Sequence, residues 1–88
     1  MSDGHIHTSH PRILARLKRA EGHLRSVIGM IEGQRSCVDI AQQLQAVESA
    51  LANAKRELIH DHIENCLDAP GADPKAALPE LKAITKYL

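Results

Sequence analysis

The sequence predicts an all-α protein, a three-helix protomer with a long central helix. The 88 residues include no Phe, no Trp and a single Tyr, although 43% of them are apolar, and a core of Leu, Ile, Val and Ala is typical of packed helices. Apolar residues recur every three or four positions through most of the chain, which is the helical period. This pattern is interrupted at Gly33 and again by Pro70, Gly71 and Pro74.

The first helix is expected to follow a polar, His-rich segment. Residues 1–10, MSDGHIHTSH, are predicted to form a flexible N-terminal tail, and residues 11–88 a single helical domain. Ser9 is a candidate N-cap and Pro11 suits a first turn, so the helix is predicted from about Pro11 to Ile31 or Glu32, closed by Gly33. Its apolar stripe comprises Leu14, Leu17, Leu24, Ile28 and Ile31.

The second helix is predicted to be long and unbroken. Ser36 followed by Asp39 resembles a capping box in which Asp replaces the usual Glu. From there to about Cys66 no Gly or Pro occurs, and positions three and four apart share one face. That face comprises Cys37, Ile40, Leu44, Val47, Leu51, Ala54, Leu58 and His62.

A loop and a short last helix complete the predicted protomer. Leu78, Leu81, Ile84 and Leu88 fall on one side of this helix. Pro79 is a poor residue for a helix interior, so the regular part is expected to begin near it. The sequence contains no internal repeat and no second domain.

Charge is balanced overall but concentrated locally. The chain has 11 basic and 11 acidic residues, yet Arg12, Arg16, Arg19 and His23 form one stripe on the first helix, and Lys55 and Arg56 add charge on the second. These arginines and lysine are candidate contacts to DNA phosphates. The alternative is an ordinary solvated helix face. No helix-turn-helix signature is present, so DNA would have to meet a surface formed by several subunits.

Two cysteines and six histidines suggest metal binding. The sequence shows neither a signal peptide nor an apolar run long enough to span a bilayer, so we expect a cytoplasmic location, no membrane partner and no stable disulfide. His62 and Cys66 lie four residues apart on one helix face, as a two-point clamp for a transition metal requires. The alternative is a seam histidine beside a buried thiol.

Cys37 can join this pair only from a second chain. It lies 25 residues before His62, or roughly 37 Å along one helix, while metal–ligand bonds are about 2.0–2.3 Å. An antiparallel copy of the helix would bring its own Cys37 to this end, giving a homodimer with two equivalent sites between subunits. Three ligands suit Cu(I). A fourth from His5, His7 or His10 would suit Ni(II), Co(II) or Zn(II).

Two other classes of protein are alternatives to a metal-responsive DNA-binding protein. A thiol enzyme would need an oxyanion hole or a pocket, which the pattern does not offer, so we expect neither an enzyme nor a small organic substrate. A structural helical oligomer or a metal-storage protein would share the ligands but would bind no promoter DNA.

Three segments resemble the CsoR/RcnR family of bacterial metal-sensing repressors: RLKRAEGHLR at 16–25, RSCVDIAQQLQAVESAL at 35–51 and AKRELIHDHIENCL at 54–67. The resemblance covers nearly the whole chain. Cys37, His62 and Cys66 match the family's ligand positions, and His5 falls where the tail ligand of nickel and cobalt members lies. It implies a tetramer built as a dimer of dimers, and operator DNA bound by the metal-free form and released by the metal-bound form. The DNA contacts carry over best to Arg16 and Arg19.

Within the family the chain is most similar to DmeR-type repressors of nickel and cobalt exporters, notably in DIAQQL, LIHDHIENCL and ITKYL. Ni(II) or Co(II) is therefore the expected effector, with a Cu(I) sensor using Cys37, His62 and Cys66 as the alternative. Copper members carry Tyr before the first Cys and Glu on the last helix; here Ser36 takes the first position, and the second falls near Lys82, with Glu80 close by. Aldehyde sensing through Cys37 ranks below both.

Overall fold

The computed structural model of the chain describes residues 9–68 and 74–88, without the side chains of residues 66–68, 74 and 77. These residues form three helices: α1 (His10–Glu32), α2 (Cys37–Asp68) and α3 (Pro74–Thr85). The predicted all-α protomer with a long central helix is confirmed. No helix in the described ranges is long and apolar enough to cross a membrane.

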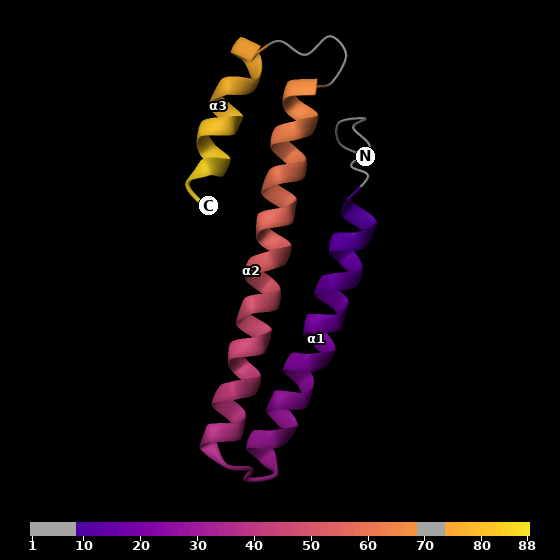
Figure 1. Cartoon of the computed structure of the whole chain (residues 1–88), viewed down its shortest axis with the longest axis vertical. Helices are drawn as coiled ribbons and strands as arrows, with labels where there is room; N and C mark the ends of the chain where they lie inside the picture. The colour runs from indigo at the N-terminus through magenta and orange to yellow at the C-terminus, as the bar shows by residue number, and fades with distance from the viewer. Residues whose placement is uncertain (1–8, 69–73) are drawn as a thin grey trace.

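The helices form an elongated structure in which α2 is the centre (Figure 1). α1 runs antiparallel to α2 along much of its length, and α3 folds back along the C-terminal part of α2. In the described part of the chain α1 and α3 each pack on α2 and not on each other. The molecule measures 56 × 23 × 16 Å. The beginning of α1, the end of α2 and α3 therefore share one end of the molecule.

The contact between α1 and α2 is made by residues seven apart. Ile13, Ala20 and Val27 are buried on α1, and they face a row on α2. That row continues the same spacing through Val47 and Ala54, because every seventh residue returns to nearly the same side of a helix. The leucine stripes noted in the sequence lie beside this seam and are largely exposed in the single chain.

The caps of α1 differ from the expectation, whereas the cap of α2 agrees with it. Ser9 does hold the N-cap position of α1, but its hydroxyl makes no capping hydrogen bond. At the other end Gly33 has φ −84°, and the positive φ of 59° falls on Gln34. The Ser36 cap is confirmed, because its Oγ accepts a 3.1 Å hydrogen bond from the Asp39 amide.

α3 begins earlier than the sequence suggests. The helix starts at Pro74 and continues through Pro79, so the prediction that its regular part begins near Pro79 is wrong. Proline at the first position of a helix loses no intrahelical bond, because that amide would be unpaired in any residue. Pro79 costs one backbone bond, and the helix continues past it to half-buried Leu81 and Ile84.

Candidate metal centre and nucleic-acid interface

His62 lies at the end of the molecule where α2 and α3 meet. Its side chain is 20% exposed, and its Nε2 atom lies 3.3 Å from Oε1 of Glu80 on α3. Histidines that bind metals commonly use one ring nitrogen for the metal and give the other to a carboxylate, which fixes the ring. Glu80 is therefore placed to fix the ring of His62, the candidate metal ligand.

Cys37 lies at the opposite end of the same helix. It is the first residue of α2, and its thiol is free and exposed. Since α2 is one continuous helix from Cys37 to Asp68, a rise of about 1.5 Å per residue keeps Cys37 and His62 of one chain far apart. The described residues contain no group of three or more His, Cys, Asp or Glu side chains placed to hold a metal ion.

The other two predicted ligands are placed only in part. Cys66 is in the last turn of α2, one turn beyond His62, but its side chain is outside the described atoms. His5 and His7 lie outside the described residues, so their part in the site stays a prediction. Soft thiolate and imidazole donors fit Cu(I), Zn(II), Ni(II) or Co(II) and do not fit Mg(II) or Ca(II).

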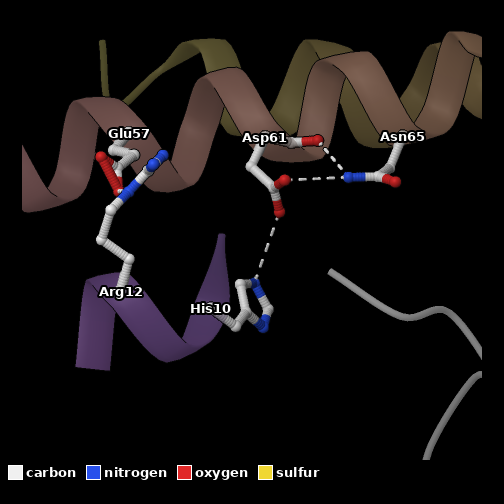
Figure 2. A network of polar contacts seen from close by, with 5 residues as sticks. All are labelled: His10, Arg12, Glu57, Asp61 and Asn65. Atoms are coloured by element: carbon white, nitrogen blue, oxygen red, sulfur yellow. Dashed lines mark hydrogen bonds and ion pairs between the residues drawn. The ribbon is translucent and has the colours of Figure 1, made fainter. Parts of the chain in front are cut away.

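A second polar cluster lies next to His62, between the start of α1 and the end of α2 (Figure 2). Asp61 is buried, and its Oδ2 atom lies 3.8 Å from Nε2 of His10. Asn65 donates to Asp61 through its Nδ2 atom, at 2.8 Å to the backbone oxygen and 3.0 Å to Oδ1. His10, a candidate tail ligand in the sequence, is the first residue of α1 and faces Asp61.

The predicted basic stripe is partly neutralised from within the chain. Glu57 of α2 accepts a 3.0 Å hydrogen bond at Oε1 from Nε of Arg12, and Nε of Arg16 lies 3.7 Å from its Oε2 atom. Figure 2 shows Arg12 reaching across from α1 to Glu57. The two arginines are 64% and 45% exposed, so their guanidinium groups stay open to a partner in solvent.

Two open hollows mark the same face of the α1–α2 pair. One, of about 490 Å³, is lined by Arg16, Asn53, Arg56, Glu57 and His60. The other is smaller and is lined by Arg16, Arg19, Ala20, His23 and Ala50. The structure therefore brings Arg12, Arg16, Arg19 and Arg56 onto one polar surface, while Lys55 lines a different hollow with Leu88.

Two side-chain bonds order this basic surface. Arg56 donates from Nη1 to Oδ1 of Asn53 at 2.8 Å. Nε2 of His23 lies 2.6 Å from Oε1 of Gln43, which joins α1 to α2. Each bond limits the rotamers of a side chain that faces the hollows, so the surface is partly preorganised.

Glu57, Asp61 and Gln43 were not singled out from the sequence. The hydrogen bond between Asn65 and Asp61 could have been predicted from the sequence, because residues four apart share a helix face. The pairs that cross between helices, such as Arg12 with Glu57, leave no local signal. They depend on which turns of α1 and α2 lie opposite each other.

A large apolar surface remains uncovered in the single chain. α2 carries an open groove lined by Ala41, Leu44, Gln45, Val47, Glu48 and Leu51. Leu44 and Leu51 are 43% and 45% exposed, and the apolar stripe of α1 is exposed beside it. Contiguous apolar surface of this kind marks interaction sites in proteins.

The chain matches the family model described as metal-sensitive transcriptional repressor over residues 9–87. It is 43% identical over 76 residues to the copper-sensing transcriptional repressor CsoR of Mycobacterium ulcerans, covering 84% of this chain and 65% of that protein. It is 40% identical over 77 residues to CsoR of Bacillus subtilis, covering 85% of this chain and 76% of that protein. The chain thus spans slightly less than two thirds of the mycobacterial CsoR proteins, 65% and 64% of their length.

Among solved structures the fold is similar to the nickel-responsive transcriptional regulator InrS. The TM-score is 0.79 at 31% sequence identity, and the match covers 97% of this chain and 98% of that one. The similarity in fold therefore covers nearly all of both chains.

Proposed function

Because the chain belongs to the family of metal-sensitive transcriptional repressors, we propose that it binds operator DNA when metal-free and releases it on binding a transition metal ion. Released DNA would allow expression of a metal-efflux gene. Family membership makes the protein a transcription regulator and not an enzyme. The operator and the metal are its proposed partners, and the cytoplasm its proposed location.

Cu(I) is the effector that the observations favour. The carrying observation is the identity of 38–43% to several relatives named as copper-sensing repressors. The donors agree with this, since Cys37, His62 and Cys66 form a three-ligand thiolate and imidazole set suited to Cu(I). Glu80 of α3 faces His62 and could take the part of the last-helix Glu that the resemblance assigns to copper members. From the sequence alone, the Glu position of copper members falls near Lys82, which weakened the case for a copper sensor.

Ni(II) or Co(II) is the second candidate, and it was the first expectation from the sequence. The similarity to the nickel-responsive InrS supports it, as does His5, which would supply a fourth ligand. The finer assignment to DmeR-type repressors belongs to this candidate. Zn(II) fits the same donors.

The proposed site lies between two chains. α2 is continuous, so Cys37 would meet the His62 and Cys66 of an antiparallel partner. The uncovered groove around Leu44 and Leu51 is where the two α2 helices would pack, and two such dimers would form the tetramer. Arg12, Arg16, Arg19, Lys55 and Arg56 remain the proposed DNA contacts.

Release follows from linkage between the two sites. If metal binds the DNA-incompetent arrangement more tightly, it lowers DNA affinity by the same coupling free energy. A coupling of about 3 kcal/mol weakens operator binding somewhat more than 100-fold. We propose that the contact between His10 and Asp61 transmits metal binding to the basic surface, because it connects α1 to α2 one residue from His62.

The test is fluorescence anisotropy of the reduced protein on its own promoter, under anaerobic conditions, with Cu(I), Ni(II), Co(II) and Zn(II) added separately. Release by Cu(I) at low stoichiometry supports the first proposal, and release by Ni(II) or Co(II) alone supports the second. His5→Ala separates them, since it should weaken a Ni(II) response and leave a Cu(I) response nearly unchanged. A metal-free protein that binds no promoter DNA would refute repression itself.

A further inference from the structure

Glu57 lies within contact distance of two arginines of the proposed DNA-binding surface. Its two carboxylate oxygens face Nε atoms of two arginines on the neighbouring helix, Arg12 at 3.0 Å and Arg16 at 3.7 Å. A carboxylate between two guanidinium groups offers them the same charge-assisted contacts as a phosphate does. Glu57 is 20% exposed and lies behind the more exposed arginines.

The geometry points to Glu57 as a positioning residue for DNA binding. In the DNA-free protein it holds the side chains of Arg12 and Arg16, which belong to α1, against α2, and it competes with DNA phosphates for them. This inference rests on the proposed function, because it assumes that the basic surface meets DNA. Its consequence is that the chain binds any duplex less tightly than its arginine content would allow. Exposed ion pairs are weak, so this competition should lower DNA affinity without abolishing DNA binding.

Position in the fold separates this role from the metal response. Glu57 lines the hollow with Arg16, Asn53, Arg56 and His60, on the basic face. In the described part of the chain the ion pairs of Glu57 are with Arg12 and Arg16 of α1, and none joins it to His62 or α3. Glu57 is therefore expected to set the strength of DNA binding without taking part in metal binding.

The decisive readout is the salt dependence of DNA affinity. Counterion release gives a slope of about −0.9 in log K against log[salt] for each phosphate neutralised on B-DNA. Glu57→Gln frees positive charge for phosphates, so the slope should steepen by about one for each protomer that contacts the duplex. At low salt the same variant should bind roughly two- to tenfold more tightly.

Asp39→Asn is the matched control. It removes the same charge from α2, but Asp39 is 52% exposed, pairs with Arg35 at 3.9 Å and lies at the other end of the helix. A general net-charge effect would change both variants equally and would overturn the inference. Weaker DNA binding by Glu57→Gln would also overturn it, because the carboxylate would then be aiding the complex.

A double-mutant cycle with Arg12→Gln tests the specific pair. If Glu57 competes for Arg12, then losing Arg12 should weaken DNA binding more in the Glu57→Gln background than in wild type. Additive effects would refute the pairing, and circular dichroism of each variant checks that α1 and α2 remain folded. Wild-type protein that binds no duplex at any salt would refute the proposed function, whereas wild-type binding with an unchanged slope in Glu57→Gln would refute this inference alone.

Discussion

Nε2 of His62 on α2 lies 3.3 Å from Oε1 of Glu80 on α3, so the last helix holds the ring of the candidate metal ligand. Glu80→Ala should lower metal affinity by about 10- to 100-fold, because the ring loses its orienting carboxylate. Chelator competition measures this, while metal-free DNA affinity should stay at the wild-type value. Lys82→Ala, an exposed change two residues further along α3, is the control and should keep wild-type metal affinity.

Mixing two defective variants tests whether the metal site joins two chains. Cys37→Ser and His62→Ala should each abolish the site when pure. Co-refolded in equal amounts, they should recover about one quarter of wild-type capacity, since half of the dimers are mixed and each has one intact site of two. Anaerobic metal titration of the purified mixture gives the number. No recovery from a mixture shown to contain mixed dimers would place the ligands within one chain.

The apolar groove on α2 is expected to hold the two chains together. Leu51→Glu places a charge in that groove and should shift the protein toward monomer. Sedimentation velocity at several concentrations measures the shift. Gln42→Glu, at an exposed position outside the groove, adds the same charge and should leave the assembly intact. Equal dissociation by both variants would contradict this interface.

The two serines before α1 and α2 should differ in their contribution to stability. Ser36→Ala removes the 3.1 Å bond to the Asp39 amide and should lower the free energy of unfolding by about 1 kcal/mol. Ser9→Ala should cost nothing or stabilise slightly, because the Ser9 hydroxyl is buried without a hydrogen-bond partner in the described structure. Urea denaturation at one protein concentration compares them. A larger loss for Ser9→Ala would contradict the observed cap geometry.

The type of all three helices, and the extent of α1 and α2, were predictable because they follow from local chemistry. Periodicity defined α2, and Ser36 marked its start within one residue of the observed Cys37. The distance argument for Cys37 also needed only a helical rise and an unbroken run. The assembly and the ligand set remain predictions, because both depend on a second chain.

Contacts between helices could not be predicted in the same way. Arg12 meets Glu57 across 45 residues of sequence, and His10 approaches buried Asp61. Both depend on the relative axial position and rotation of α1 and α2, which a stripe of leucines does not specify. The early start of α3 had another cause. Pro79 predicts a helix break locally, but one lost backbone bond does not stop the helix, which continues to half-buried Leu81 and Ile84.

The covalent connection between α1 and α2 spans only residues 33–36, and it lies at the end of the molecule opposite the start of α1, the end of α2 and α3 (Figure 1). A helical hairpin tied at one end frays from the other, since opening there costs the fewest contacts. Amide hydrogen exchange should therefore be slowest near Val27 and Val47 and fastest toward His10 and α3. The end that is expected to open most easily also carries the proposed metal site, so little free energy should be needed to rearrange the helices there. Metal that joined this end to a partner chain's Cys37 would hold the helices together.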